Sequence, residues 1–516
     1  MIKLTKTDFQ SLKSLEKYLL LFTLFFIGLL YFRFLPLNYD YDGTVFSQYL
    51  RYAVVKNDLT PILHPHHLFY FPCNYLLYKS LHWLTGYQVL EYFHLQIFSL
   101  LFGLFTLGVI YKILYKITDS RFFSITGVLL IAFSYGIWYY SVEAEVDMPG
   151  LFFIAAGIYL LFFKPFNTKN IVLSALLFSI AAGFHLTNGL IVLSVFFYFI
   201  YEKKSFVSIL KFYLFYFFFL AIPYLFFYLS TKFDLVGEFK EQLSGSKDYF
   251  AGYKIVYWES FSFQSILDSL QVIATGILRP SSSLLSILSL LLLGLIAAVI
   301  AFPGKKETDK NIYFKMLFWM VPYLLFFTFW ANTNLGFKLN VILPLLILAV
   351  YSLSRLNQNK AKKLIFVFVI FLVFVSNFYF SIKPANKPEN NPGYQLAKAI
   401  ENKTENESFI IIAGCGTKVS VFSKIYIPYF AYRKIFILDW MLGKGLSLED
   451  IYVTIQKEKS KNKSLYLLSE LTYMNKALKV LLENHHLDSG DFFRFIKRFE
   501  VKRKIPLTGE YFLLLL

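Results

Sequence analysis

Residues 15–35 form the first long apolar run of the chain and read Leu-Glu-Lys-Tyr-Leu-Leu-Leu-Phe-Thr-Leu-Phe-Phe-Ile-Gly-Leu-Leu-Tyr-Phe-Arg-Phe-Leu. A run of about 20 apolar residues is long enough to cross a hydrocarbon core of ~30 Å as a helix. The run must be helical because its backbone groups have no water to bond with in lipid. No small-residue cleavage site follows it, and it continues into Arg33 and aromatic residues. We therefore interpret it as a retained membrane span rather than a removed signal peptide.

Further apolar runs of this kind follow along the chain. They occupy residues 90–115, 121–140, 147–163, 171–185, 188–201, 207–230, 282–302, 313–331, 338–354 and 364–382. Charged residues make up only 16% of the chain, whereas a soluble domain carries about 25%. The sequence therefore predicts an all-α polytopic membrane protein with about 11 transmembrane helices. The two short runs between residues 171 and 201 are expected to be tilted, broken or joined as a helical hairpin.

Lysine and arginine gather in every second loop between the predicted spans. The basic loops contain Lys3, Lys6, Lys13, Lys17, Lys112, Lys116, Arg121, Lys164, Lys169, Lys203, Lys204, Lys305, Lys306, Lys310, Arg355, Lys360, Lys362 and Lys363. The intervening loops are acidic or uncharged, as in residues 143–147, 185–188 and 332–334. Because basic loops stay in the cytoplasm, we expect a cytoplasmic N-terminus and an extracytoplasmic C-terminal region in the cytoplasmic (inner) membrane. This placement explains the net charge of +18 and argues against a nucleic-acid partner.

Two domains are expected: a transmembrane domain over residues 1–382 and an extracytoplasmic α/β domain over residues 383–516. The first contains a large outer loop at 36–88 and a second at 231–280. Within the 36–88 loop, Thr44–Val55 and Leu68–Leu84 mix apolar and polar residues at helical spacing, which is typical of helices lying along a membrane surface.

The C-terminal domain alternates short apolar runs with helical patterns. The runs are Ser408–Ala413, Lys434–Asp439 and Ser464–Leu468, and the helical patterns are Ser447–Lys457 and Tyr473–Asn484. This alternation predicts a largely parallel sheet.

Asp40 and Asp42 follow the first span on its outer side. Alternate residues of an extended segment point to the same face, and a carboxylate at that place is suited to accept a proton from an acceptor hydroxyl while its neighbour orients the acceptor. The alternative is a helix N-cap supplied by Asp42 or Thr44.

The densest histidine cluster is His64-Pro65-His66-His67. Three interpretations stay open: metal ligands, hydrogen-bond donors to a phosphate near the headgroups, or an interfacial turn fixed by the proline.

The two cysteines, Cys73 and Cys415, lack C-x-x-C spacing, so a structural zinc site is unsupported. A disulfide between them is allowed but not required.

Ionisable residues also occur at the outer ends of later spans. They are Glu143, Glu145, Asp147, His185, Arg279 and Lys338. Such groups are functional candidates when they face a shared cavity. The two cations are suited to neutralise a phosphate, although long basic side chains at span ends also snorkel to the interface.

Together these features resemble the C-type glycosyltransferase (GT-C) superfamily, and within it the bacterial protein O-mannosyltransferase-like family of membrane proteins. Four segments match in order: Asp40-Tyr-Asp42-Gly43, His64-Pro65, Ser134-Tyr-Gly-Ile-Trp138-Tyr-Tyr-Ser-Val-Glu143-Ala-Glu145-Val146, and Gly183-Phe-His185-Leu-Thr187. The likeness covers residues 15–200. The chain departs from that family where Val45 and Phe46 replace a glutamate and where His66-His67 replace Pro-Gly.

The resemblance implies an inverting glycosyltransferase with a polyprenyl-phosphate sugar donor and an extracytoplasmic acceptor that is a protein, lipid or glycan. The expected catalytic residues are Asp42 as general base and Asp40 as helper. Glu145 and Glu143 would organise the acceptor site, and the donor phosphate would contact His64, His66, His185, Arg279 and Lys338. The carboxylates permit a divalent metal without requiring one.

Two other functional classes compete with this one. A lipid or solute transporter or flippase would show inverted repeats with polar breaks near the midplane, whereas the polar residues here gather at one side. An assembly protein would need far fewer spans for anchoring.

Overall fold

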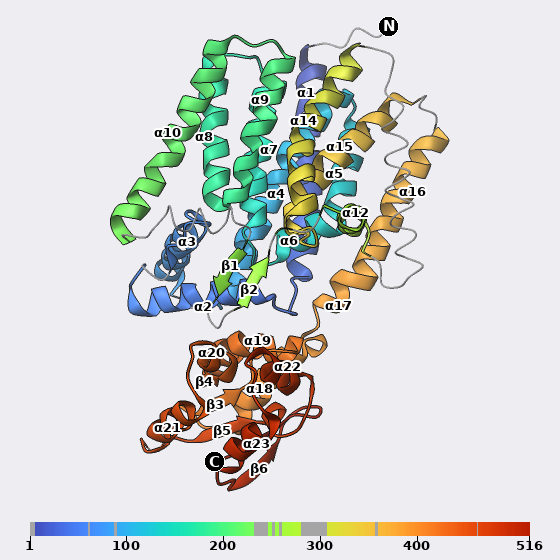
Figure 1. The fold of residues 1–516 in the computed structure, drawn as a ribbon. Helices are drawn as coiled ribbons and strands as arrows, with labels where there is room; N and C mark the ends of the chain where they lie inside the picture. The colour runs from blue at the N-terminus through green and yellow to red at the C-terminus, as the bar shows by residue number, and fades with distance from the viewer. Residues whose placement is uncertain are drawn as a thin grey trace. The chain divides into compact units, whose positions relative to one another are not determined.

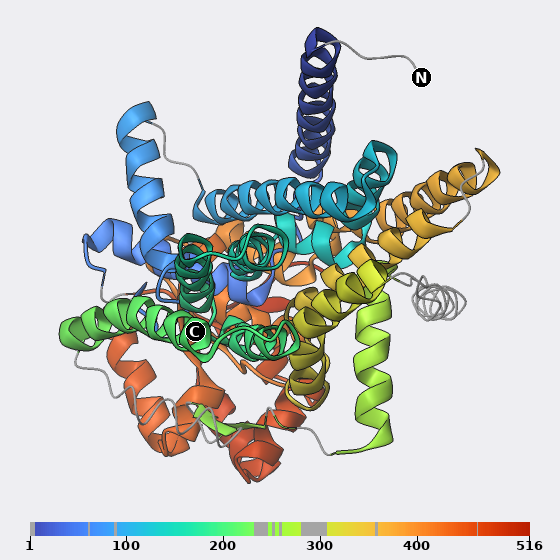
Figure 2. The same ribbon diagram turned by 90° about the horizontal axis from the view of Figure 1, so that it is seen from above.

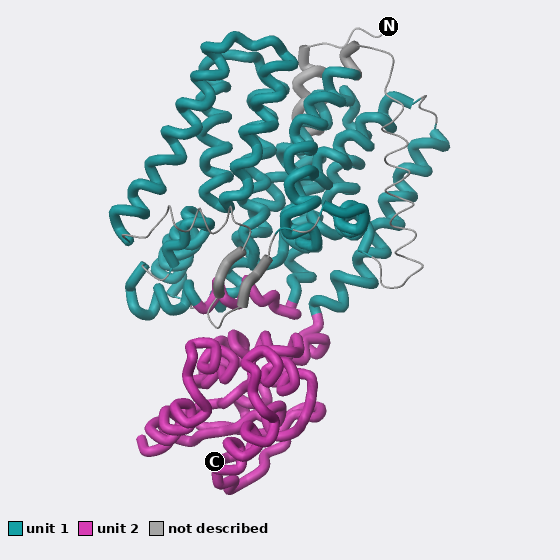
Figure 3. Tube along the Cα trace, in the orientation of Figure 1, with its two compact units in different colours: residues 1–36, 49–238, 257–386 teal, residues 37–48, 239–256, 387–516 magenta. Residues whose placement is uncertain are grey.

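The computed structural model describes residues 6–59, 62–86, 90–231, 246–249, 253–256, 258, 261–279, 307–356, 360–461 and 463–516. The chain forms two compact units, which Figure 3 shows in different colours. Unit 1 comprises residues 1–36, 49–238 and 257–386, and unit 2 comprises residues 37–48, 239–256 and 387–516.

Unit 1 is built from helices. They are α1 (Lys6–Arg33), α3 (Tyr70–Thr85), α4 (Glu91–Thr118), α5 (Arg121–Phe133), α6 (Tyr135–Val142), α7 (Asp147–Phe163), α8 (Thr168–Phe184), η2 (Leu186–Leu190), α9 (Ile191–Tyr201), α10 (Phe206–Thr231), α12 (Phe263–Ile277), α14 (Glu307–Phe329), η3 (Gly336–Lys338), α15 (Leu339–Arg355), α16 (Lys360–Asn377), η4 (Phe378–Ile382) and α17 (Lys383–Ala385). Helix α2 (Tyr41–Lys56) begins in unit 2 and continues into unit 1. The bundle is shown in Figure 1.

The apolar helices confirm the polytopic α-helical membrane fold. Within the described residues, five helices are individually long and apolar enough to cross a bilayer: α4, α10, α14, α15 with η3, and α16 with its continuation to Ala385. Only 11% of the apolar window of α10 is buried inside the protein. An apolar surface of that size requires an apolar surrounding, which lipid supplies. The predicted span 282–302 lies outside the described residues.

The predicted span 121–140 is broken into α5 and α6, which meet at an angle of 67°. Ser134 separates them with an extended backbone, φ −64° and ψ 139°, which interrupts the helical hydrogen-bond ladder. Beyond the break, the fully buried Trp138 stacks on Tyr31 at 5.4 Å between ring centroids. The break thereby fixes the direction of α6 and of the loop with Glu143 that follows it.

Helices α3 and α12 run across the direction of the spanning helices. Each is seen nearly end-on in Figure 1 and along its length in Figure 2, which views the molecule from above. For α3 this agrees with the prediction of a surface helix over Leu68–Leu84. The exposed side chains of α12 include Phe263, Ile266 and Leu270, as expected where a helix lies against the lipid interface.

Unit 2 contains a five-stranded sheet with the order β4-β3-β5-β7-β6. The strands are β3 (Phe409–Ile412), β4 (Lys434–Ile437), β5 (Leu465–Leu468), β6 (Arg503–Pro506) and β7 (Phe512–Leu515). The predicted parallel pairing holds for β4, β3 and β5, while β7 and β6 add an antiparallel edge that was not predicted. A short hairpin of β1 (Ser246–Tyr249) and β2 (Tyr253–Val256) also belongs to this unit.

Helices cover both faces of the unit 2 sheet. They are α18 (Pro392–Lys403), α19 (Lys418–Tyr426), η6 (Ile427–Ala431), α20 (Leu438–Gly443), α21 (Leu448–Lys459), η7 (Ser469–Leu471), α22 (Lys476–Asn484) and α23 (Ser489–Lys497). Every residue of β3 and β5 is buried, which is typical of a sheet with apolar layers on two sides. After β3, Gly416 has φ +79°, and a Cβ there would lie 2.7 Å from the backbone of Ala477. This glycine therefore permits close packing of α22.

Candidate functional site

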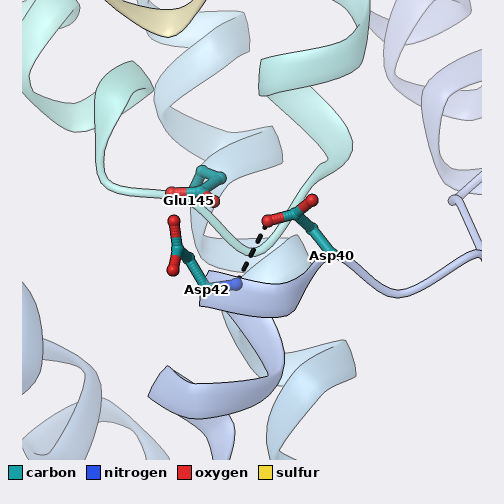
Figure 4. Close-up of side chains that lie close together, drawn as sticks. All are labelled: Asp40, Asp42 and Glu145. Carbon is teal, nitrogen blue, oxygen red and sulfur yellow. Dashed lines mark hydrogen bonds between the residues drawn. The ribbon is translucent and has the colours of Figure 1, made fainter. Parts of the chain in front are cut away.

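Asp40 and Asp42 lie where α2 begins. The Asp42 backbone N–H donates to Oδ2 of Asp40 at 3.1 Å, as Figure 4 shows. The Thr44 backbone N–H donates to the Asp40 carbonyl at 3.1 Å. These contacts make Asp40 the N-cap residue, so the assignment of that role to Asp42 or Thr44 is wrong. Because α2 begins at Tyr41, Asp42 lies in the first helical turn and does not share an extended segment with Asp40 in the way that the sequence pattern predicts.

The carboxyl group of Asp42 has perturbed acidity. Desolvation by neighbouring protein atoms, followed by the negative charge of Asp40, raises the pKa of Asp42 to about 6, although the residue is exposed at the surface. A carboxylate whose pKa lies close to the working pH is an effective general base, because it is ionised and still basic enough to hold a proton. Carboxylate oxygens such as those of Asp40 and Asp42 are also the ligands that hard divalent cations prefer.

Four histidines of unit 1 come together from two distant parts of the chain. The His67 ring lies 5.3 Å from that of His64 and 5.1 Å from that of His185, and His64 and His66 are 5.0 Å apart, all measured between centroids. We call these four residues the histidine cluster. The resemblance implies a donor-site role for His64, His66 and His185 but not for His67, whose ring lies close to both His64 and His185.

Backbone contacts hold the loop with the first three histidines against the turn after α8. The Leu186 N–H donates to the His66 carbonyl at 3.2 Å, and the Phe69 N–H donates to the Gly183 carbonyl at 3.0 Å. A Cβ on Gly183 would lie 2.3 Å from the Phe69 ring, so glycine is required for this close approach. The Gly-x-His-x-Thr segment therefore orders the histidine cluster.

The histidine cluster is electrically neutral at its centre. Burial, followed by repulsion from His185, His64 and His66, lowers the pKa of His67 well below its ordinary value. A neutral imidazole keeps one N–H donor and one acceptor. In His67 the Nδ1–H donates to the Phe184 carbonyl at 3.3 Å, whereas in His185 Nδ1 accepts the Thr187 N–H and the donor is Nε2–H. Among the described residues, these histidines do not bring three ligand atoms within 4.8 Å of one another, so the metal interpretation does not fit their geometry.

The loop between α6 and α7 places Glu143 and Glu145 differently. Glu143 is fully buried, and its Oε1 accepts the Tyr92 hydroxyl and the Ala144 N–H, the latter at 3.0 Å. Glu145 is half-buried, and its backbone carbonyl accepts the Ser99 hydroxyl at 3.1 Å. Tyr92 and Ser99, both on α4, therefore fix the loop. Sequence reasoning missed them because they are embedded in an apolar run.

A small pocket of unit 1 lies beside the histidine cluster and is partly open to solvent. Its lining residues are Asp147, Leu151, Thr187, Asn188, Tyr323, Phe327, Gly336, Phe337, Leu339 and Asn340. The Thr187 hydroxyl lies 2.6 Å from His185 Nδ1, and the Phe337 ring lies 5.4 Å from the His185 ring. A Cβ on Gly336 would lie 2.8 Å from the Asp147 carboxylate. Asp147 thus faces a polar recess at the start of α7.

The two predicted phosphate-binding cations have partners inside unit 1. The Arg279 guanidinium lies 4.6 Å above the Tyr135 ring, and its backbone N–H donates to Asn377 at 2.9 Å. The Lys338 ammonium is fully buried and donates to the Phe327 carbonyl. Lys338 directly follows Phe337 in the chain. Its side chain has to rotate before the ammonium can leave the Phe327 carbonyl and contact a phosphate.

Comparison with known proteins identifies the fold. No protein-family model and no curated protein matches the chain. ArnT from Cupriavidus metallidurans, solved with bound undecaprenyl phosphate, superposes with a TM-score of 0.62 at 9% identity over 98% of both chains. Its apo structure gives 0.61 at 10% identity. The mycobacterial arabinofuranosyltransferase AftD gives 0.51 at 12% identity, covering 88% of this chain and 35% of that one. The chain therefore has the GT-C-like fold of ArnT.

Proposed function

We propose that this protein is an inverting membrane glycosyltransferase that moves a sugar from a polyprenyl-phosphate donor to an extracytoplasmic acceptor. The observation that carries the proposal is the match in fold to ArnT over 98% of both chains, in a structure that contains undecaprenyl phosphate. Fold by itself does not determine activity. The residues of the first outer loop and of the histidine cluster supply the chemistry that such a transfer needs.

Asp42 is assigned as the general base. The acceptor O–H attacks the anomeric carbon, the bond from that carbon to the phosphate oxygen breaks, and polyprenyl phosphate leaves with the electron pair. The acceptor proton passes to Asp42, whose raised pKa suits it to hold that proton. Attack from the side opposite the phosphate inverts the anomeric centre. Asp40 orients Asp42 through its cap, and Glu145, held by Ser99, orients the acceptor.

The histidine cluster is assigned to the donor phosphate. As charge develops on the departing phosphate, N–H donors that are already in place stabilise it without reorganisation. Neutral imidazoles supply such donors without the cost of burying a charge. Lys338, next to Phe337 at the cluster, and Arg279 are the candidate cations for the same phosphate.

Liposomes that contain the purified protein and a labelled polyprenyl-phosphate sugar test this proposal against the transporter alternative. A glycosyltransferase separates the sugar from its lipid, whereas a flippase moves the intact lipid-linked sugar between leaflets. Transfer of label to an acceptor supports the proposal, and movement of intact donor without cleavage would replace it by the alternative.

Replacing His185 by Phe is expected to raise the KM for the donor roughly tenfold, because Nδ1 of His185 accepts the Thr187 N–H and the ring proton is therefore on Nε2. A hydrogen bond to a charged group contributes about 1.5–3 kcal/mol, and 1.4 kcal/mol corresponds to about a tenfold change in affinity. His82→Phe, on the exposed part of α3, is the matched control and should leave KM unchanged. Equal KM values for the two variants would remove His185 from the donor site.

The pH profile should report the Asp42 carboxyl group. Because the base must be ionised, kcat/KM is expected to fall as the pH decreases through about 6. Asp40→Asn removes a neighbouring negative charge, which lowers the pKa of Asp42, so the acid limb should move to lower pH while transfer continues. An acid limb that stays in place in Asp40→Asn would contradict the assignment of this limb to Asp42.

A further inference from the structure

The segment that leads to Asp40 and Asp42 is held by side chains of the C-terminal part of unit 2. The Asn391 amide donates to the Asn38 carbonyl at 2.5 Å, and the Tyr426 hydroxyl donates to the Tyr39 carbonyl. These residues are about 350–390 positions away in sequence, and all of them belong to unit 2. The carbonyls of the two residues before Asp40 are thus satisfied from the C-terminal domain.

Both polar atoms of the Asn391 side-chain amide form hydrogen bonds. Its Oδ1 accepts the Tyr394 N–H at 3.0 Å and caps α18, while its Nδ2 also donates to the Tyr426 hydroxyl at 3.3 Å. We call Asn391 and Tyr426 the clamp. Both are buried, so breaking either contact leaves a buried polar group unpaired.

Aromatic packing and backbone geometry strengthen the clamp. The Tyr39 ring lies 4.7 Å from Phe430 and 5.0 Å from Tyr394, measured between centroids. Tyr39 also has φ +37°, a left-handed conformation that a bulky residue adopts only when its surroundings impose it. The contacts of the clamp surround this strained residue, immediately before Asp40.

We propose that the C-terminal domain is a working part of the catalytic site: the clamp sets the position of Asp40 and, through the cap, of Asp42. The inference rests on the proposed function for its kinetic consequence. Asn391 and Tyr426 are positioning residues, because they act through the backbone of residues 38–40. The α/β topology of the domain does not by itself suggest this role in positioning Asp40 and Asp42.

Two variants separate the clamp from the stability of the domain. Asn391→Asp keeps an oxygen to cap α18 but replaces the amide donor by a carboxylate that repels the Asn38 carbonyl. Tyr426→Phe keeps the ring and removes only the hydroxyl. Tyr466→Phe is the matched control, because the Tyr466 hydroxyl bonds to Glu405 within the same domain, far along the chain from residues 37–48.

Hydrogen exchange and kinetics are then measured on the full-length protein in detergent. Both clamp variants should increase amide exchange in residues 37–48 and lower kcat roughly 10–100-fold, since a small misplacement of a catalytic group has effects of that size. The donor KM should stay within about twofold, because the histidine cluster belongs to unit 1. Tyr466→Phe should change neither exchange in 37–48 nor kcat.

Each result decides the inference. Unchanged exchange in residues 37–48 would overturn the clamp, and increased exchange with unchanged kcat would overturn its positioning role. A rise in donor KM that matches the fall in kcat would indicate general loss of structure instead. If Asn391→Asp does not fold, Tyr426→Phe decides the question. If the wild-type protein transfers no sugar, the proposed function fails, while hydrogen exchange still tests the clamp.

Discussion

Asp42→Asn is expected to lower the rate of sugar transfer about 10²–10⁴-fold, the usual contribution of a general base. The amide has almost the same shape as the carboxylate but cannot take up the acceptor proton. Because Asp40, not Asp42, supplies the N-cap oxygen of α2, the substitution leaves the helix start intact. The measurement is kcat with purified protein and a saturating polyprenyl-phosphate sugar.

Two controls make this result specific. Donor binding, measured separately, should be unchanged in Asp42→Asn, because the donor phosphate is assigned to the histidine cluster. The double variant Asp40→Asn/Asp42→Asn should be inactive while inserting normally into the membrane. Full activity of the double variant would rule out the segment with Asp40 and Asp42 as the source of the base.

Glu143→Ala is expected to destabilise the protein by about 2–4 kcal/mol and to reduce transfer together with it. The substitution leaves the Tyr92 hydroxyl and the Ala144 N–H without their buried acceptor, and each unpaired group costs about 1–3 kcal/mol. The loop that places Glu145 loses its anchor at the same time. Thermal unfolding in detergent and the transfer rate are the two measurements.

Glu143→Gln separates hydrogen bonding from charge at this position. The amide oxygen still accepts from Tyr92 and from the backbone of Ala144, so the loss of stability should be about 1 kcal/mol or less. If Glu143→Gln were as damaging to transfer as Glu143→Ala while remaining stable, a carboxylate would be needed at residue 143, and its role would be chemical rather than organising.

The membrane fold was predictable from sequence because lipid exposure imposes a strong, local pattern. A helix such as α10 must be apolar over most of its surface, and its sequence shows this without knowledge of its neighbours. The parallel strands of unit 2 were predictable for a related reason, since strands buried on both faces are apolar throughout. Strand β6 lies at the edge of the sheet, where burial is incomplete and the apolar pattern is weak, and β7 lies between β6 and β5.

The candidate site was less predictable because its geometry depends on contacts distant in sequence. Ser134 is an ordinary residue in an apolar run, and nothing local distinguishes it as a break between α5 and α6. His64 and His185 were selected from their residue types, but only the fold shows that His67 lies between them. Asp40 took the capping role because α2 begins one residue later, and helix ends are the least certain part of any sequence prediction.

The clamp shows the same limitation in a stronger form. Asn391 and Tyr426 are polar residues in a domain that the sequence analysis assigned no role, and their partners are the backbone carbonyls of residues 38 and 39. Backbone acceptors have no signature in a sequence, so their partners are found only in a structure.

Mass-spectrometric detection of released polyprenyl phosphate tests the central claim most directly. Purified protein is incubated with a panel of polyprenyl-phosphate sugars and a membrane extract as the source of acceptor, beside Asp42→Asn and the exposed control Asp58→Asn. We expect the wild-type protein and Asp58→Asn to release the free lipid phosphate from at least one donor, and Asp42→Asn to release almost none. Release at the same rate by all three proteins, or by none of them with any donor, would contradict the assignment of this protein as a glycosyltransferase that uses Asp42.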